Sequence, residues 1–355
     1  MRTLTTAAVV VFVLTAPAGA AACDPQVLDF GALPGQSRAE IDVIGPRGLM
    51  GGSSRAADGS TLAVLWRDGS IADMGVEGFV ADIEARGDVL VQGPHDFETF
   101  TGSAYVQPRG GTLEPLPGLG GDWVWARRMN ERGDVAGSAS DAQGVEHAVH
   151  WRHGRPVDRG VPASYGGAYA RGINERGDLV GAAYGAEIST PWIWRADGTS
   201  GPLDPGFPDR NGSGDAFVID DQGRAAGVSG PFFEPFGEAT IWTRDGLRRG
   251  LGTFPGDDFS VIVGTNGQGD WIGGSGAPDS RVLLTDGRRL LTMRSLDGDP
   301  SGFSLAHAIT RRRSGDVDVG GTSDAGDGRR PATLWRCAYT QAFGPPGDAP
   351  DAVGG

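Results

Sequence analysis

Short apolar stretches rich in β-branched and aromatic residues, separated by polar turns that contain glycine, cover most of the chain. The clearest example runs from residue 168 to 203, with apolar segments at 168–173, 178–183, 191–194 and 199–203. The turns at 174–177 and 197–198 and one longer polar loop separate these segments. This pattern predicts a meander of four short antiparallel strands. A single sheet of this kind has two apolar faces that it cannot bury alone.

The same unit recurs along the chain, and its turn glycine marks the period. Successive turn glycines are 39, 46, 44, 46, 46 and 46 residues apart, at Gly48, Gly87, Gly133, Gly177, Gly223, Gly269 and Gly315. A second glycine usually follows four residues later, at Gly52, Gly137, Gly181, Gly227 and Gly273, with Gly93 and Gly320 as the matching positions in the second and last copies. The third apolar segment ends in tryptophan at 63–66, 148–151, 239–242 and 332–335. Seven copies with this period predict an all-β, seven-bladed β-propeller of four-stranded antiparallel blades.

The two ends of the repeat region complement each other. No fourth strand follows Trp335, whereas residues 26–31 precede the first complete unit and match the fourth-strand segment 70–75. We therefore expect an N-terminal strand to complete the last blade and close the ring. One propeller domain is expected over residues 23–343, followed by a disordered Pro/Gly-rich tail at 344–355.

The first 22 residues have the features of a secretory signal peptide. Arg2 precedes an apolar core at 7–14, and the small residues Ala18, Gly19 and Ala20 resemble a cleavage site. No stretch of the chain approaches the roughly 20 apolar residues that a spanning helix needs. We expect a secreted or periplasmic protein with no membrane span, and acylation of Cys23 as a lipoprotein remains an alternative.

The repeat also resembles a known family. A strand ending in Ile-Asn, a glycine turn, a Val-Gly strand, a His-Ala-x-x-Trp segment and an Asp-Gly turn are similar to the HAF repeats of secreted bacterial proteins, over roughly Val27 to Arg336. The His-Ala pair survives only at His147 and Ala148, and Val149 stands where the family has Phe. The resemblance implies an extracellular or periplasmic repeat protein and supplies no reaction.

The net charge and the absence of catalytic motifs disfavour several classes of function. The formal net charge of −14 gives no electrostatic reason to bind nucleic acid or anionic lipid. The chain has no G-x-S-x-G elbow, no phosphate-binding G-x-x-x-x-G-K-[ST] loop and no H-E-x-x-H motif. A monomeric binding protein is therefore favoured over an enzyme.

In a four-strand meander, the crossings between blades and the loops between the second and third strands lie on one face, and the tight turns lie on the other. The long loops combine aromatic and acidic residues, which suit a sugar or a cation and favour neutral sugars, cations or basic peptides over anionic partners. The alternative is that the acidic residues form turns and the aromatic residues pack between blades. The candidate ligand-binding residues are Asp122, Trp123, Tyr165, Asp209, Asp257, Asp258 and Asp299.

No metal ligand set is predicted from the histidines. Strand alternation places His147 and His150 on opposite faces, and His153 belongs to the following turn. A structural Ca²⁺ near residues 297–299 or 324–327 stays open, although neither segment has the full ligand series of a calcium loop. No other cofactor is expected.

Two functions follow. The favoured one is an exported, non-catalytic propeller that binds a glycan, a peptide or a partner in the cell envelope. The alternative is a glycan-directed extracellular hydrolase or lyase that uses carboxylates at the mouth of the central channel. Carboxylates meeting an arginine or histidine in a deep channel would favour the enzyme, and an aromatic shelf would favour binding.

The cysteines generate the first prediction. Aligning Gly31 with Gly75 places Cys23 at the position of Arg67, across the missing hairpin turn from Cys337. We expect a Cys23–Cys337 disulfide that closes a loop of about 300 residues and stabilises the ring by several kcal/mol. Reduction should lower the Tm with little change in strand content. Mass spectrometry that finds both thiols free in the exported protein, or Cys23 acylated, would exclude the bond.

Overall fold

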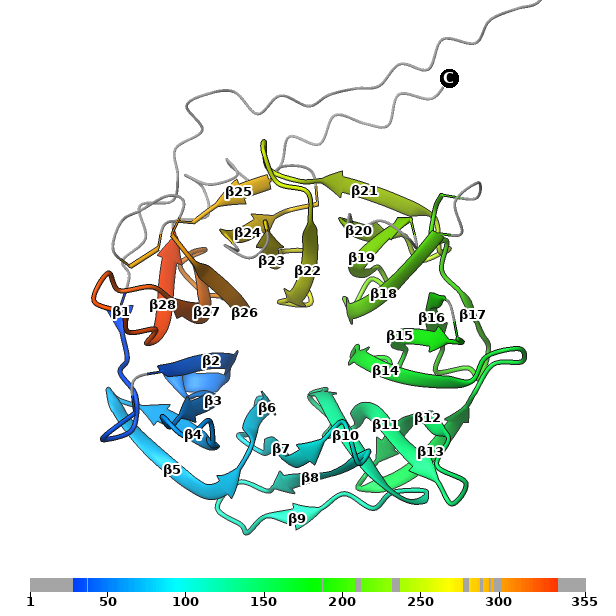
Figure 1. Cartoon of the computed structure of the whole chain (residues 1–355), viewed down its shortest axis with the longest axis horizontal. Coiled ribbons are helices and arrows are strands. Elements are labelled where there is room, and N and C mark those ends of the chain that lie inside the picture. Colours follow the sequence, from blue (N-terminus) through cyan, green and yellow to red (C-terminus); the bar gives the residue numbers. More distant parts are fainter. Residues whose placement is uncertain are drawn as a thin grey trace, which may run out of the picture.

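Seven four-stranded antiparallel sheets are arranged around a central opening, like the blades of a propeller (Figure 1). The computed structural model describes residues 28–36, 38–186, 188–207, 212–231, 237–276, 281–287, 290–293, 295–296 and 302–337. The predicted signal peptide, Cys23, the tail at 344–355, Asp209 and Asp299 lie outside these residues. The predicted seven-bladed fold is confirmed.

Each of the first three blades uses four consecutive strands. Blade 1 contains β2 (Arg38–Ile44), β3 (Met50–Arg55), β4 (Thr61–Arg67) and β5 (Ser70–Glu77), with the single-turn 3-10 helix η1 (Pro46–Gly48) between its first two strands. Blade 2 contains β6 (Phe79–Ile83), β7 (Val89–Asp96), β8 (Thr101–Gln107) and β9 (Glu114–Pro115). Blade 3 contains β10 (Gly120–Met129), β11 (Val135–Asp141), β12 (Glu146–Arg152) and β13 (Arg155–Gly160).

The remaining blades follow the same order from the channel outward. Blade 4 contains β14 (Gly167–Ile173), β15 (Leu179–Tyr184), β16 (Ser189–Trp194) and β17 (Ser200–Pro202). Blade 5 contains β18 (Gly212–Ile219), β19 (Ala225–Pro231), β20 (Glu238–Trp242) and β21 (Arg248–Gly252). Blade 6 contains β22 (Ser260–Thr265), β23 (Trp271–Ser275), β24 (Arg281–Thr285) and β25 (Leu290–Thr292). Blade 7 contains β26 (Ser304–Arg311), β27 (Val317–Ser323), β28 (Ala332–Cys337) and the N-terminal β1 (Leu28–Asp29).

The N-terminal strand closes the ring as expected. β1 pairs antiparallel with β28, Leu28 opposite Leu334 and Asp29 opposite Thr333 (Figure 1). The alignment of Gly31 with Gly75 also holds, since both have a positive φ and each donates its amide to the aspartate two residues before it, at 2.7 Å. The last blade is therefore assembled from both ends of the repeat region.

The glycine of the first turn has the left-handed backbone that the sequence predicts. All seven turn glycines have φ between 76° and 106°. In the turn of blade 3, the side-chain oxygen of Asn130 accepts the amides of Arg132 and Asp134, both at 3.1 Å. Asn174 and Asn266 cap the turn backbone of blades 4 and 6 in the same way.

A β-bulge interrupts the inner strand of every blade. In blade 3, Ala126 lies opposite Gly137 and Arg128 lies opposite Ala136, so Arg127 is an extra residue with no partner of its own. The same shift occurs at one place in each of the seven inner strands. A bulge re-aims the extra side chain, and here it is directed toward the channel.

The second glycine of the repeat is required by this bulge. A Cβ on Gly137 would lie 2.0 Å from the carbonyl oxygen of Trp125, and equivalent approaches of 1.7–2.0 Å occur at Gly52, Gly181, Gly227, Gly273 and Gly321. In blade 7 the glycine at this position is Gly321, because it lies opposite Ala306, the residue before the bulge. The prediction that Gly320 is the second glycine of this copy was therefore wrong by one residue. In blade 2, Val91 and not Gly93 takes this place. There Gly78, with φ of 124°, approaches the carbonyl of Gln92 instead.

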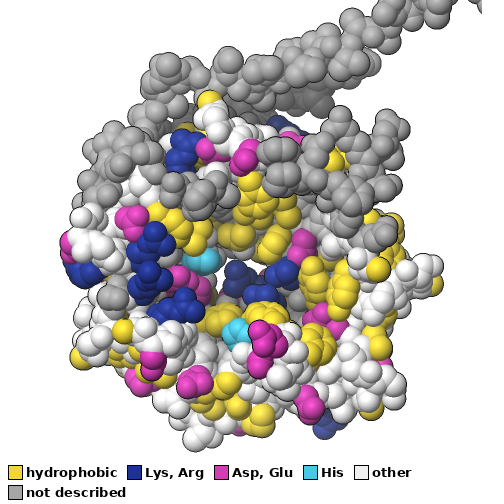
Figure 2. All heavy atoms as spheres, viewed as in Figure 1, with side chains coloured by type: hydrophobic (Ala, Val, Ile, Leu, Met, Phe, Trp, Pro, Cys, Tyr) yellow, Lys and Arg dark blue, Asp and Glu magenta, His cyan; other side chains and the backbone are white. Residues whose placement is uncertain are grey.

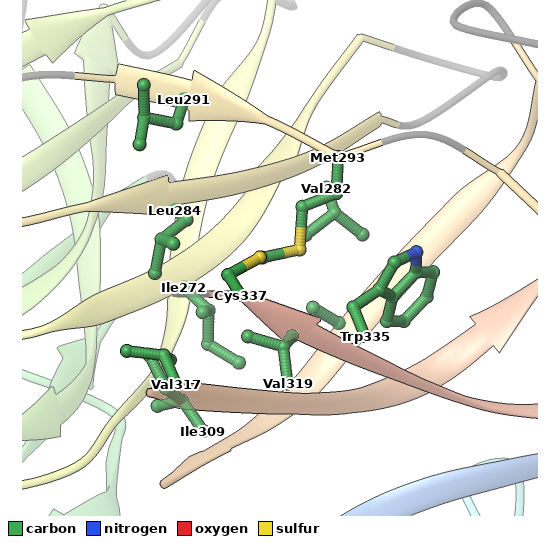
Figure 3. Packing of buried hydrophobic residues seen from close by; sticks show 11 residues of the cluster. Ile272, Val282, Leu284, Leu291, Met293, Ile309, Val317, Val319, Trp335 and Cys337 are labelled. Atoms are coloured by element: carbon green, nitrogen blue, oxygen red, sulfur yellow. The ribbon is translucent and has the colours of Figure 1, made fainter. Parts of the chain in front are cut away.

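Neighbouring blades bury their faces against each other. Between blades 6 and 7, Ile272, Leu284 and Met293 pack with Val319 and Trp335 (Figure 3). The tryptophans that end the third strands of four blades, Trp66, Trp151, Trp242 and Trp335, are fully buried. Cys337 ends β28 within the same cluster and is also buried, while its predicted partner Cys23 lies outside the described residues. Stability therefore comes from blade-to-blade contact.

The close approach at the bulge gives a test of the fold. Gly181→Ala places a Cβ 2.0 Å from the carbonyl oxygen of Tyr169 and should destabilise the protein by about 3 kcal/mol, because the first two strands of the blade must separate. Gly201→Ala, in the same blade, meets no atom within 4 Å and should change stability by less than about 0.5 kcal/mol. Chemical denaturation of both variants measures the difference, and equal stabilities would contradict the account.

Candidate functional site in the central channel

The seven extra residues of the bulges form a ring that lines the channel. They all border one cavity of about 210 Å³ within it. In blade order they are Asp42, Ala81, Arg127, Arg171, Phe217, Val263 and His307. We call this set the channel ring.

The seven residues of the channel ring differ in chemistry, although they occupy equivalent backbone positions. Asp42 and His307 lie on the adjacent blades 1 and 7, and Arg127 and Arg171 lie on the adjacent blades 3 and 4. Blades 5 and 6 contribute apolar side chains and blade 2 contributes an alanine. Acidic, basic, aromatic and aliphatic side chains therefore face one cavity from equivalent backbone positions.

The arginine side of the ring contains one paired and one unpaired guanidinium. The Arg171 Nε lies 2.7 Å from Asp215 Oδ2, which also accepts a 2.9 Å hydrogen bond from the Tyr169 hydroxyl. Arg127 has no hydrogen bond or ion pair with any described residue, and it stacks 4.3 Å above the ring of Trp125. Burial, with Arg171 and Arg128 nearby, lowers the pKa of Arg127 to about 9. An anionic group would relieve this repulsion.

Aromatic rings connect Arg127 to the long-loop face. Trp123, Trp125 and Arg127 alternate along β10 and so share one side of the strand. Phe100 stacks on Trp123 with ring centroids 4.6 Å apart, and Trp123 stacks on Trp125 at 5.2 Å. Phe97, which is 66% exposed, contacts both indoles. We call these four rings with Arg127 the aromatic column.

A hydrogen-bond network holds the aromatic column in place. Glu146 Oε1 accepts from the Trp123 indole at 3.0 Å and from the Ser138 hydroxyl at 2.5 Å. The other oxygen of Glu146 accepts from the Tyr184 hydroxyl at 2.8 Å. A pocket of about 160 Å³ lies between the column, Glu146, Tyr169 and Arg171. Polar acceptors and aromatic faces therefore border the same space.

The channel opens on both faces of the propeller. On the long-loop face, a mouth of about 370 Å³ is lined by Arg38, Arg55, Arg127 and Arg330 together with Glu40 and Asp42, and Figure 2 shows basic, acidic, histidine and hydrophobic side chains around the central opening. On the short-turn face, an opening of about 340 Å³ is lined by the ends of the inner strands and their first turns. The short-turn face thus has a concavity that the sequence did not indicate.

The opposite side of the ring brings together two carboxylates and an imidazole. Asp42 and His307 border all three channel cavities, and Glu40 lies at the long-loop mouth. Burial and the nearby Glu40 raise the pKa of Asp42 well above its usual value, against the opposing effect of Arg128. Burial lowers the pKa of His307 against the opposing effect of Glu40, and Arg128 acts in the same direction as burial.

Of the residues predicted from the sequence, one lies in this site. Trp123 belongs to the aromatic column, whereas Asp122 is exposed on the same strand and borders none of the pockets described above. Tyr165 is half-buried and donates to the Thr190 hydroxyl at 3.0 Å. Asp257 lies 2.6 Å from Arg281 in an ion pair, and Asp258 is exposed. Asp209 and Asp299 lie outside the described residues.

The channel ring has a nearly constant offset in the sequence, but no recurring residue type marks it. In six copies its residue lies six positions before the turn glycine, as Asp42 does before Gly48, and in the last copy His307 lies eight positions before Gly315. The residue type changes from copy to copy at this offset, unlike the turn and core positions around it. A search for repeated residues passes over such a position.

The histidine triplet of blade 3 is arranged as its strand alternation predicts. His147 Nδ1 lies 2.9 Å from Asp158, and its Nε2 lies 3.4 Å from Asp141. His150 is buried, with its Nε2 3.7 Å from Asp134 Oδ2, and His153 occupies the turn with φ of 50°. These three histidines therefore do not form a metal-binding group.

Comparisons with known proteins support the fold alone. No family model matches the chain, and no curated protein matches its sequence. Among solved structures, a catalytically inactive virginiamycin B lyase from Staphylococcus aureus with quinupristin is similar at a TM-score of 0.57 and 10% identity, covering 88% of this chain and 99% of that one. Puromycin hydrolase matches at a TM-score of 0.57 and 14% identity, over 88% of this chain and 53% of the hydrolase.

A third similar structure is the β-propeller domain of the Trilobed protease from Pyrococcus furiosus, described as having an open velcro topology. It has a TM-score of 0.56 and 11% identity, and the match covers 88% of this chain and 99% of that domain. The resemblance to HAF repeats remains a prediction. Within the described residues, no helix is long and apolar enough to cross a membrane.

His150 gives a pH prediction. Burial lowers its pKa from 6.5 to about 4, so the unfolded chain binds the proton more readily than the folded chain. The contribution of neutral His150 to the free energy of unfolding is therefore fully present above the unfolded-state pKa of 6.5. It is lost as the pH falls from 6.5 toward 4, by about 3 kcal/mol in total. His150→Phe should reduce the loss of Tm between pH 7 and pH 4 relative to the wild type. An equal loss of Tm in the variant and the wild type would contradict this role.

Proposed function

We propose that this protein is an exported, non-catalytic propeller that binds a glycan bearing carboxylate groups at the long-loop mouth of the channel. One observation carries the proposal: Arg127 joins the aromatic column to the channel ring and has no ionic partner among the described residues. A saccharide with an anionic substituent complements both parts of this arrangement.

Phe97 is the exposed member of the aromatic column and suits the apolar face of a sugar ring, while the buried Trp123 and Trp125 support it. Phe97 presents an exposed ring beside the pocket, above the two stacked indoles. Aromatic rings offer a large apolar surface at small conformational cost, and nearby polar groups can bond to hydroxyls. Glu146 and Tyr169 border the pocket and provide such groups.

The arginines of the mouth favour an anionic substituent. Arg38, Arg55, Arg127 and Arg330 outnumber Glu40 and Asp42 in the lining of one cavity, although the chain as a whole has a formal charge of −14. Guanidinium groups bind carboxylates through paired, charge-assisted hydrogen bonds. The local charge therefore favours an acidic glycan over the neutral or cationic ligands expected from composition.

The proposed location rests on the sequence of the N-terminal segment. A signal peptide at 1–22 and the similarity to HAF repeats support export to the periplasm or beyond the cell, where acidic glycans occur as polymers. We expect the protein to act as a monomer.

Calorimetric titration with oligogalacturonate tests the proposal. We expect saturable binding that weakens with added salt, and at least a tenfold loss of affinity in Arg127→Ala, which corresponds to about 1.4 kcal/mol. Phe97→Ala should weaken binding to a smaller extent. Asp258→Ala, on the same face but outside the mouth, is the matched control and should bind as the wild type does.

A neutral oligosaccharide and an acidic peptide test whether the ligand is an acidic glycan. Maltohexaose is neutral, and equal affinity for it would show that the arginines do not select the ligand. An acidic peptide that binds while both oligosaccharides fail would overturn the glycan in favour of a protein partner.

A second candidate function is the glycan-directed hydrolase or lyase. One observation favours it: Glu40, Asp42 and His307 lie close together in the channel, with Arg128 nearby. Carboxylates that meet an arginine or a histidine in a channel are the arrangement expected for such an enzyme. Incubation with oligogalacturonate and measurement of new reducing ends and of unsaturated products would reveal either activity. Glu40→Gln should abolish it if the channel carboxylates take part. The absence of turnover in the wild type leaves the binding function.

A further inference from the structure

We propose that the channel holds a divalent metal ion bound by Glu40, Asp42 and His307. One ligand atom from each of these side chains lies within 4.8 Å of the other two, and no other group of this kind occurs among the described residues. The site does not depend on the proposed glycan, since the metal can be measured alone.

The fold brings the three ligands together from the two blades that close the ring. Asp42 and His307 are the extra residues of neighbouring bulges, in β2 and β26, and Glu40 precedes Asp42 by two residues. His307 Nε2 lies 4.0 Å from Glu40 Oε2, which is too long for a hydrogen bond. Nitrogen and oxygen ligands that share one ion at bonds of about 2.0–2.2 Å lie roughly 3–4 Å apart.

The imidazole of His307 is prepared to act as a ligand. Its Nε2 atom is buried and has no hydrogen-bond partner among the described residues. A buried nitrogen of this kind costs free energy unless it is paired, and a metal ion would supply the missing partner.

The ligand types indicate which ion fits. Two carboxylates and one imidazole suit Mn²⁺ or Zn²⁺ better than Ca²⁺, which prefers six or more oxygen ligands. Arg128 opposes cation binding through its nearby charge, but two carboxylates face this one guanidinium. Three protein ligands leave coordination positions open for water or for an anionic group in the channel.

His147 also has two carboxylates as neighbours, but their arrangement differs from that of the channel site. His147 lies between Asp141 and Asp158, but these approach opposite nitrogens of the ring. Its ligand atoms therefore cannot meet at one ion. At residues 324–327, where a structural Ca²⁺ remains a prediction, Asp324 pairs with Arg330 and Asp327 pairs with Arg329.

Titration of Mn²⁺ into the chelator-treated full-length exported protein, followed by electron paramagnetic resonance and calorimetry, tests the site. We expect one ion per chain and a higher Tm in its presence. His307→Ala and Asp42→Asn should each weaken binding at least tenfold, and His147→Ala should leave it unchanged. Glu40→Gln, at a side chain that is 44% exposed, should weaken binding without impairing folding.

The metal-free Tm and circular dichroism of each variant separate loss of ligation from loss of structure. The proposal is overturned if the wild type binds neither Mn²⁺ nor Zn²⁺ saturably, or if the folded His307→Ala and Glu40→Gln variants bind as the wild type does. Failure of oligogalacturonate binding would leave the metal result unaffected.

Discussion

The rest of this structure depends on the contact between a second-strand glycine and a carbonyl group of the inner strand. In six blades this contact leaves no room for a Cβ, since one would lie within 2.0 Å of the carbonyl oxygen. The approach accommodates the bulge of the inner strand, where two residues lie opposite one. A bulge adds local twist and bends the strand, which helps a four-stranded blade to turn about the ring axis. Glycine is needed here for space, whereas in the turns it is needed for a positive φ.

The bulge also connects the scaffold to the site. Its extra residue is free of ladder pairing and is directed into the channel, so its identity is not constrained by the packing of the blade. The repeat therefore conserves backbone geometry while Asp42, Arg127, Phe217 and His307 differ completely in chemistry at one structural position. An asymmetric ligand site can arise in this way from nearly identical units.

The acidic composition of the chain is largely a property of its turns. Asp29, Asp73, Asp158 and Asp197 each accept the amide of the residue two positions later, at 2.7–2.9 Å. These carboxylates cap loop backbones on the rim, while arginines line the mouth of the channel. Net charge therefore does not describe the long-loop mouth, where Arg38, Arg55, Arg127 and Arg330 outnumber Glu40 and Asp42.

The sequence by itself determined the number of blades, the turn chemistry and the closure of the ring. These features are local or periodic, since a left-handed turn glycine recurs in all seven copies and a buried tryptophan lies near the end of the third strand in most of them. It also indicated Trp123, because an aromatic residue in a crossing loop is conspicuous. It did not indicate Arg127 or His307, and it misplaced the close-approach glycine in two blades. Only the tertiary structure decided these points, because the bulge is visible in the pairing of two strands and the channel exists only where seven inner strands meet.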